Sequence, residues 1–284
     1  MIEAKTALAT ETVADHYDEL DRWYLAIWGE HIHHGLWLTG RETTGEATHN
    51  LVARLAERLS IGAGTRVCDI GCGYGATARV LAREYGGLVT GVTLSEAQYA
   101  YAVQAGAEDG DPQVLRMDFM DNDFETDSFD AAISVESSEH FQDKPGLFDE
   151  MYRIVRPGGR VGIYAWLAKQ DAAPWQVDKL LEPICREGRL PGMGTEQDYR
   201  GWLCEAGFMD VTFEDYSRNV KRTWPIIVGR MAKRLLWDRS AWAFLFSGAR
   251  NLEFGKSIFR IWLAYELGSM RYGLFTATKP ERPA

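Results

Sequence analysis

The sequence Val67-Cys-Asp-Ile-Gly-Cys-Gly-Tyr-Gly75 joins an apolar run to a series of alternating glycines. The apolar run, residues 66–70, predicts a buried β-strand, and the helical spacing of apolar side chains over residues 76–85 predicts an α-helix. The turn between them brings bare backbone and a helix N-terminus close to a ligand, because glycine has no side chain in the way. The rest of the chain is interpreted outward from this turn.

One class of ligand for such a turn is a dinucleotide. Gly71, Gly73 and Ala76 fit the pattern G-x-G-x-x-G/A, in which a pyrophosphate lies on the helix N-terminus. That pattern also requires an acidic residue about twenty positions later to bind the ribose. The second predicted strand, residues 88–92, ends instead in Thr93. A nicotinamide dehydrogenase is therefore the weaker alternative.

The carboxylate of Asp69, at the tip of the first strand, points to a different ligand. It would repel a pyrophosphate, whereas it suits a ligand that carries an ammonium group and a sulfonium. The pattern Asp69-x-Gly71-x-Gly73-x-Gly75 resembles the first motif of the class I S-adenosylmethionine-dependent methyltransferases. A structural turn without a ligand is the remaining interpretation.

Composition and charge limit the domain number, the partners and the location that we expect for this protein. The chain has 284 residues, is 46% hydrophobic and carries a net charge of -10, which allows one large α/β domain with insertions or two small domains. The acidic balance argues against nucleic acid as a partner. We find no signal peptide, no apolar stretch long enough to span a bilayer and no CxxC pair among the four cysteines. We therefore expect a cytoplasmic protein without a transmembrane segment.

Strand and helix alternate from residue 66 to residue 166, which predicts an α/β fold with a doubly wound, mostly parallel sheet. The expected strands are 66–70, 88–92, 114–117, 129–135 and 160–166. Residues 208–216 and 272–278 are also strand-like, and we expect them to add an antiparallel hairpin. The predicted helices outside the lid include 46–59, 76–85, one that starts at Pro145, and 196–206.

The expected organisation surrounds this sheet with two helical additions. The segments are a helical N-terminal cap at 1–60, a cofactor-binding core at 61–170, the end of the core with an irregular excursion and the sixth strand at 171–223, a helical substrate lid at 224–270, and the last strand and tail at 271–284. Aromatic residues favour a lid over a dry pocket rather than simple packing. They are Trp237, Trp242, Phe244, Phe246 and Phe254.

Polar residues follow the predicted strands, where open α/β sheets bind their ligands. Asp118 and Phe119 come after the third strand, where a carboxylate can accept from an exocyclic amine and a backbone amide can donate to a ring nitrogen. An ordinary polar loop is the alternative. After the fourth strand comes the cluster Glu136-Ser-Ser-Glu139-His140.

Ser95 and Gln98 allow two interpretations. Ser95-x-x-Gln98 reads as a capping box at the start of a helix, and Thr93 with Gln98 could instead hydrogen-bond a ribose. Gln98 cannot serve both purposes with the same atoms, and the alternatives stay open.

The triplet His31, His33 and His34 suggests a metal, but no cluster of cysteines or carboxylates supplies further ligands at familiar spacing. We expect these histidines to pack, and no metal to bind.

Two further stretches, residues 88–98 and 136–140, narrow the resemblance. They are similar to the cyclopropane fatty acid synthase-like methyltransferases, and within these to the tocopherol and related small-molecule methyltransferases, whose leader resembles residues 28–35. The resemblance implies S-adenosylmethionine as cofactor and S-adenosylhomocysteine as product. The implied cofactor-binding residues are Tyr17, Asp69, Gly71 and Gly73 at the methionine end, Thr93, Leu94 and Gln98 at the ribose, Asp118 and Phe119 at the adenine, and Glu136. It places Glu139 and His140 near the acceptor.

These expectations combine into a methyltransferase that acts on a hydrophobic small molecule, such as an aromatic, phenolic or terpenoid natural product, at carbon or oxygen. His140, next to Glu139, is then the candidate base, and a strand-end histidine bonded to backbone is the structural alternative. Other functions left open are N-methylation of an amine or alkaloid and a non-catalytic S-adenosylmethionine-binding partner. The sequence is compatible with a homo-oligomer.

Overall fold

A seven-stranded sheet forms the centre of the computed structural model, which describes residues 1–5, 11–238, 242 and 249–282. Its strand order is β4-β3-β2-β5-β6-β9-β8, and β9 runs antiparallel to both of its neighbours while the other strands run parallel. The strands are β2 (Arg66–Ile70), β3 (Leu88–Thr93), β4 (Gln113–Arg116), β5 (Phe129–Val135), β6 (Val155–Ala168), β8 (Met209–Asp215) and β9 (Met270–Thr278). A separate two-stranded sheet pairs β1 (Ile2–Glu3) with β7 (Gly192–Met193).

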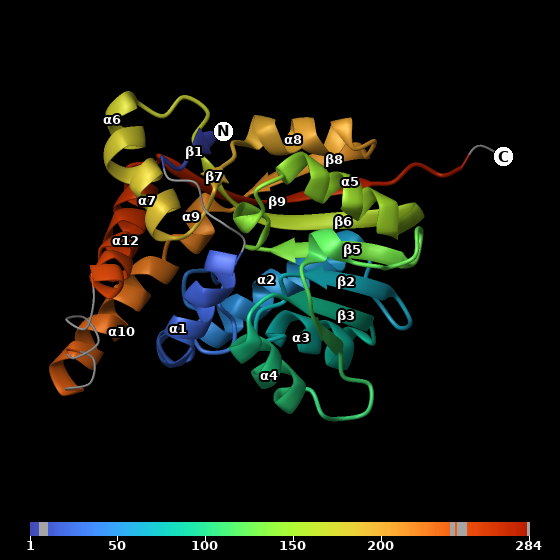
Figure 1. Ribbon diagram of the computed structural model, residues 1–284, viewed down its shortest axis with the longest axis horizontal. Helices are drawn as coiled ribbons and strands as arrows, with labels where there is room; N and C mark the ends of the chain where they lie inside the picture. The colour runs from blue at the N-terminus through green and yellow to red at the C-terminus, as the bar shows by residue number, and fades with distance from the viewer. Residues whose placement is uncertain (6–10, 239–241, 243–248, 283–284) are drawn as a thin grey trace.

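Helices cover both faces of the large sheet (Figure 1). Those of the core are α2 (Thr44–Leu59), α3 (Ala76–Tyr85), α4 (Glu96–Ala105), α5 (Lys144–Ile154) and α8 (Glu196–Glu205). Those around one end of the sheet are α1 (Glu11–Ile27), α6 (Pro174–Gln176), α7 (Glu182–Glu187), α9 (Ser217–Val220), α10 (Thr223–Trp237) and α12 (Ala249–Glu266). The expected doubly wound fold is confirmed.

The strand order reverses between β2 and β5, since β3 and β4 lie on one side of β2 and β5 and β6 on the other. In open α/β sheets such a switch point leaves a crevice at the carboxyl ends of the strands, where ligands bind. Asp69 on β2 and Glu136 just after β5 both lie at this edge. The topology therefore brings together the two carboxylates that the sequence separates by more than sixty residues.

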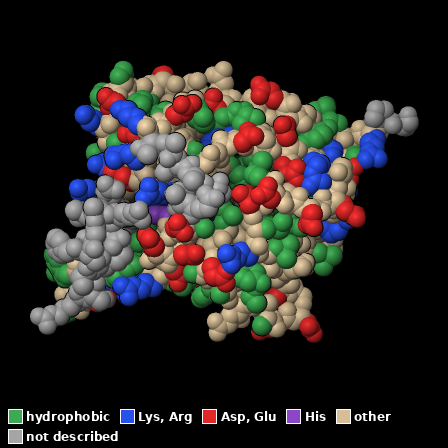
Figure 2. Space-filling view, in the orientation of Figure 1, with side chains coloured by type: hydrophobic (Ala, Val, Ile, Leu, Met, Phe, Trp, Pro, Cys, Tyr) green, Lys and Arg blue, Asp and Glu red, His purple; other side chains and the backbone are tan. Residues whose placement is uncertain are grey.

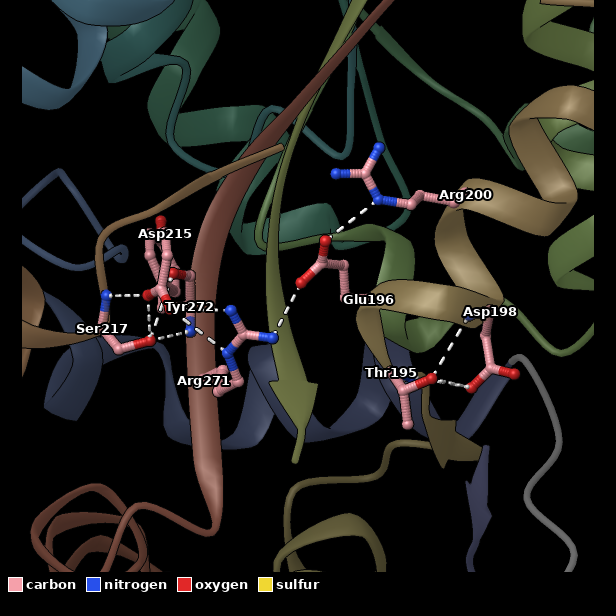
Figure 3. Close-up of polar contacts among 8 residues, drawn as sticks. All are labelled: Thr195, Glu196, Asp198, Arg200, Asp215, Ser217, Arg271 and Tyr272. Atoms are coloured by element: carbon pink, nitrogen blue, oxygen red, sulfur yellow. Dashed lines mark hydrogen bonds and ion pairs between the residues drawn. The ribbon is translucent and has the colours of Figure 1, made fainter. Parts of the chain in front are cut away.

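The antiparallel hairpin at the end of the sheet is held by polar contacts (Figure 3). Arg271 on β9 donates to Asp215 at the end of β8 (2.8 Å) and to Glu196 at the start of α8 (2.8 Å). The hydroxyl of Ser217 accepts from the backbone N–H of Tyr272 (2.9 Å). These contacts fix the hairpin to α8, and the predicted antiparallel pairing of the last two strands is confirmed.

One strand is longer than predicted. β6 begins at Val155, directly after α5, and not at Arg160. Val155 pairs with Phe129, and the register then shifts before Arg160 pairs with Ala131. This irregularity absorbs the intervening residues 156–159, where Gly158 has a positive φ of 74°. A Pro-Gly-Gly sequence therefore makes a bulged strand here and not a loop.

The two helical additions also differ from the expected ones. α2 packs on the central sheet, where Leu55 and Leu59 lie against Gly162 of β6, so the part of the leader that lies at the ligand edge is α1 with the loop after it. In the lid, Trp237 and Trp242 are 83% and 49% exposed, so their expected place in a dry pocket is wrong. The buried residues of α10, such as Trp224, lie at its other end. Phe244, Phe246 and the side chain of Phe254 lie outside the described residues.

Among the described helices, none combines the length and the apolar character needed to cross a membrane.

Gly273 tests how closely the hairpin is packed. A Cβ atom there would overlap the ring of Phe213 and the backbone carbonyl oxygen of Glu214, so Gly273→Ala should lower the free energy of unfolding by about 1–3 kcal/mol. Gly201, on α8, has nothing within 4 Å of such a Cβ. The control Gly201→Ala should raise stability by about 0.5–1 kcal/mol. Urea unfolding measures the stability of both variants, and equal unfolding midpoints for Gly273→Ala and Gly201→Ala would contradict the close packing inferred at Gly273.

Candidate active site

The glycine turn after β2 has a geometry that other residues resist. Gly71, Gly73 and Gly75 have φ angles of 75°, 56° and 71°, which only glycine adopts without strain. A Cβ on Gly71 would also overlap the side chain of Ser137. The backbone N–H groups of Gly71 and Cys72 both donate to the carbonyl of Val92 on β3, at 2.8 and 2.9 Å. The turn is thus fixed between two strands and presents bare backbone to the crevice.

A cavity with an empty volume of about 910 Å³, open mouth included, lies against this turn. All the residues predicted to bind the cofactor line it, although they come from the leader and four different strand ends. They are Tyr17, Asp69, Gly71, Gly73, Thr93, Leu94, Gln98, Asp118, Phe119 and Glu136. The leader segment 30–33, which was not predicted to bind the cofactor, lines the same cavity. The contact depends on tertiary packing, and no local motif indicates it.

Asp69 is buried, at 1% exposure, and its Oδ2 atom has no hydrogen-bond partner among the described residues. Burial raises the pKa of this carboxyl group to about 7. An unpartnered buried carboxylate is costly unless a cation or a strong donor approaches it. Its position on the wall of the cavity therefore suits a ligand with a positively charged group.

The contacts of Gln98 show whether it forms a capping box with Ser95, which the sequence left open. The hydroxyl of Ser95 accepts from the backbone N–H of Gln98 (3.1 Å), but the side chain of Gln98 accepts from the hydroxyl of Thr93 (3.1 Å) and forms no capping box. Asp18 of the leader completes the cap, since its carboxylate accepts from Ser95 and from the backbone N–H of Ala97. The side chain of Gln98 is therefore not part of the cap, and Gln98 lines the cavity together with Thr93.

At the third strand end, Asp118 caps a short 3-10 turn. Its Oδ1 accepts from the backbone N–H of Met120 (2.9 Å), and Phe119 beside it is buried. Both residues line the cavity. This hydrogen bond stabilises the conformation of the loop. It uses only Oδ1 of Asp118, and the second carboxylate oxygen takes no part in it.

A second cavity, of about 780 Å³ on the same measure, adjoins the first. Tyr17, Ile32, His33, Glu136 and His140 line both. The remaining wall is mainly aromatic and aliphatic, and it comes from the leader, the carboxyl end of β6, the α7 region and the two lid helices. It includes Tyr24, Trp28, Trp166, Ile184, Leu190, Trp224, Ile258 and Ile261.

His140 lies between the two cavities. Its Nδ1 is 3.4 Å from the backbone carbonyl of Arg189, which can only accept, so Nδ1 carries the proton. Nε2 then accepts from the hydroxyl of Tyr17 (3.0 Å). Burial lowers the pKa of His140 to about 4, so the imidazole is neutral at pH 7.

Glu139 is buried beside His140 and is bonded into the protein. One carboxylate oxygen accepts from the backbone N–H of Trp166 (2.5 Å), and the other accepts from the hydroxyl of Ser138 (3.2 Å). Burial raises the pKa of Glu139 to about 7. Burial also lowers the pKa of the nearby Lys144 to about 8, and its ammonium donates to the backbone carbonyl of Glu139 (3.0 Å).

Glu136 is the centre of a buried network. Its Oε1 accepts from the backbone N–H of His34 and from Tyr272, both at 2.7 Å, and its Oε2 accepts from Trp166 (2.6 Å). The imidazole of His34 donates through Nδ1 (3.0 Å), because its Nε2 accepts from Trp224 (2.9 Å). Burial alone would raise the pKa of Glu136, but the contacts with His34 outweigh it and lower the pKa to about 2.

This network changes the expected role of Glu136. The residue lines the cofactor cavity as predicted, yet both of its oxygens are occupied by donors from the protein. We therefore infer that it holds the leader and the lid in place, and its contact with a cofactor stays a prediction.

The remaining leader histidines pack against one another. His31 donates through Nδ1 to Nε2 of His33 (2.9 Å), and His33 donates through Nδ1 to the carbonyl of His34 (2.8 Å). Burial lowers the pKa of both imidazoles. Within the described part of the chain, no group of three or more His, Cys, Asp or Glu side chains is arranged to hold a metal.

Comparison with known proteins agrees with this geometry. Residues 4–227 match the family described as mycolic acid cyclopropane synthetase. The chain belongs to that family. It is 30% identical to tocopherol O-methyltransferase of Arabidopsis thaliana, with 98% of the chain and 85% of that protein aligned. It is 32% identical to 27-O-demethylrifamycin SV methyltransferase of Amycolatopsis mediterranei, over 90% and 92% of the two chains.

A solved structure gives the same fold. The cyclopropane synthase MmaA2 of Mycobacterium tuberculosis superimposes with a TM-score of 0.84 at 20% identity, covering 97% of this chain and all of that one. The protein is accordingly an S-adenosylmethionine-dependent methyltransferase of this family. Two features of the first cavity fit this cofactor: the unpartnered Oδ2 of Asp69 suits its ammonium group, and the bare turn at Gly71 and Gly73 admits its close approach.

The raised pKa of Asp69 predicts pH-dependent cofactor affinity. A bound ammonium group favours the ionised carboxylate and lowers its pKa in the complex, so binding releases a proton below pH 7. The affinity for S-adenosylhomocysteine should fall by up to about tenfold per pH unit below 7 and be flat just above it. Titration calorimetry from pH 5.5 to 7.5 measures this slope. In Asp69→Asn the slope should vanish, and an unchanged slope would assign the proton to another group.

Thr93 offers a smaller, separate test of the cofactor cavity. Its hydroxyl holds the side chain of Gln98, so Thr93→Val should weaken S-adenosylmethionine binding by about 0.5–1.5 kcal/mol, the usual net value of one hydrogen bond. Thr90, on the same strand outside the cavity, supplies the control Thr90→Val, which should bind as the parent does. Equal affinities of parent and Thr93→Val in calorimetry would show that the ribose is held elsewhere.

Proposed function

We propose that this enzyme methylates a hydroxyl group of a hydrophobic small molecule that occupies the second cavity. The observation that carries the proposal is the junction of the two cavities at Tyr17 and His140, with an aromatic and aliphatic wall on the far side. Two relatives support it through their names, since one is named for tocopherol and one for a rifamycin. A natural-product acceptor and a cytoplasmic site of action follow as parts of the same proposal.

The cofactor supplies a methyl group on a positively charged sulfur, which needs no further activation by the protein. We assign Asp69, Gly71 and Gly73 to its methionine end. We assign Thr93, Leu94 and Gln98 to its ribose and Asp118 and Phe119 to its adenine. The contribution of the protein is then alignment of the acceptor and exclusion of water. Tyr17 lines both cavities and is suited to close the boundary between them.

His140 is the proposed base. Its neutral imidazole directs an Nε2 lone pair toward the boundary, where the hydroxyl of Tyr17 occupies it. An acceptor hydroxyl that takes the place of the Tyr17 hydroxyl would transfer its proton to Nε2 as its oxygen bonds to the methyl carbon, and the carbon–sulfur bond would break to leave a neutral thioether. The carbonyl of Arg189 holds the other ring nitrogen in the required tautomer. Glu139 does not touch this lone pair in the described contacts, and we assign it to orienting the turn that carries His140.

A direct assay tests the proposal. Purified enzyme with methyl-labelled S-adenosylmethionine is offered hydrophobic phenols and alcohols, and amines of matched size. Transfer to the hydroxyl compounds is the expected result. Transfer only to amines would establish the N-methyltransferase alternative, and no transfer with intact cofactor binding would favour a non-catalytic partner protein.

Removing the base should separate catalysis from binding. His140→Ala should lower kcat by about 10²–10⁴-fold, the usual cost of losing a general base, while S-adenosylmethionine affinity stays as in the parent. Activity should recover at high pH with a phenolic acceptor, because the phenol then ionises in solvent. The matched control is His16→Ala: His16 lines the same cavity, burial lowers its pKa to about 3, and its Nε2 is paired with Tyr24. Equal loss in both variants would point to cavity collapse rather than base catalysis.

A further inference from the structure

The two lid helices present different faces to the second cavity and to solvent. Inward, Trp224 of α10 and Ile258 and Ile261 of α12 line the cavity. Outward, α10 exposes Leu236 and Trp237 at 78% and 83%. α12 exposes a stripe of apolar side chains at intervals of four residues, namely Phe259, Leu263 and, just past its end, Leu267. The helices lie together at one end of the molecule (Figure 1).

The segment that contains both lid helices is basic in an acidic protein. Residues 217–268 contain ten Lys and Arg against three Asp and Glu, whereas the whole chain has a net charge of -10. α10 has no acidic residue. Lys233 and Lys256 are exposed on these helices, and neither has an ion-pair partner among the described residues. In Figure 2, several Lys and Arg side chains lie toward the left-hand end of the molecule, the end at which Figure 1 draws α12.

We name these exposed residues the outer lid face. They are Lys233, Leu236, Trp237, Lys256, Phe259, Leu263 and Leu267. Among the side chains of α12 that the structure describes, Glu266 supplies the exposed carboxylate next to the stripe, and it is paired with Lys221 at 3.0 Å. The face is thus apolar with uncompensated positive charge beside it.

We propose that the outer lid face docks on the surface of an anionic lipid bilayer. Exposed Trp, Phe and Leu with flanking lysines are the composition by which helices bury an apolar face at the headgroup boundary while their charges attract anionic lipids. The lysine stems extend along apolar surface with the ammonium in the headgroup layer. A two-fold dimer through the same face is disfavoured, because it would set one strongly basic segment against another.

Docking in this orientation has a consequence for access. The second cavity lies directly behind the helices that meet the membrane. An apolar acceptor dissolved in the bilayer would then reach the cavity through the lid without crossing bulk water. This consequence rests on the proposed function, whereas the docking itself does not.

Vesicle cosedimentation of the full-length protein tests the docking. Phosphatidylcholine vesicles that contain phosphatidylglycerol should bind the protein at low salt and release it at high salt, and vesicles of phosphatidylcholine alone should bind little. The double variant Lys233→Glu/Lys256→Glu should bind the anionic vesicles about tenfold more weakly or worse. Trp237→Ser/Leu263→Ser should weaken binding at every salt concentration.

Matched controls lie at the other end of the sheet. Leu88, 60% exposed at the start of β3, and the exposed Arg160 on β6 give Leu88→Ser and Arg160→Glu, which should bind vesicles like the parent. Titration with S-adenosylhomocysteine checks that every variant is folded, independently of any acceptor. Parent protein that ignores anionic vesicles, or lid variants that bind as the controls do, would overturn the proposal. Self-association in sedimentation velocity that Trp237→Ser abolishes, without vesicle binding, would assign the face to a second copy of the chain.

Discussion

The structure depends on a carboxylate that is buried at the junction of its two cavities. Burying an ionised Glu is unfavourable by several kcal/mol unless its oxygens are fully bonded, and Glu136 meets this condition only when His34, Trp166 and Tyr272 all lie in place. These donors come from the leader, from β6 and from β9. His34 in turn accepts from Trp224 of the lid. One charge therefore requires the leader, the sheet and the lid to assemble together.

That requirement also accounts for the way the second cavity is assembled. Its wall comes from segments that no short connection joins, and each of them is tied to the network or packs beside it. His34 and Trp166 contact Glu136 directly and also line the cavity. Trp224 lines the cavity too, and it is linked to Glu136 through its hydrogen bond to His34. Glu136 itself has a positive φ of 55°, an uncommon conformation for a residue other than glycine. We infer that the bonds to the carboxylate stabilise this backbone turn, which directs the chain toward Glu139 and His140.

The sequence predicts the parts of this design that local pattern controls. Periodicity finds the first strand and its helix to the residue, and the topology then brings the polar strand ends to one edge. Contacts between segments that are distant in the sequence cannot be predicted from local pattern. Asp18 of the leader bonds the start of α4, and nothing near Ser95 in the sequence indicates this contact. The prediction for Trp237 is wrong for a related reason. The sequence pattern alone does not tell whether an aromatic residue of a lid helix faces the cavity or the solvent.

The two buried carboxylates at the ligand edge show how environment divides their roles. Asp69 and Glu136 lie at the carboxyl ends of neighbouring strands and are both nearly inaccessible. Glu136 has a full set of donors and a pKa near 2, so its charge serves the protein at any physiological pH. Within the described part of the chain, Asp69 has an oxygen without a partner, and its pKa is near 7, so its charge is open to a ligand. Groups whose environments push their pKa values apart take different functions. Here the satisfied carboxylate builds the site, and the unsatisfied one is left to bind in it.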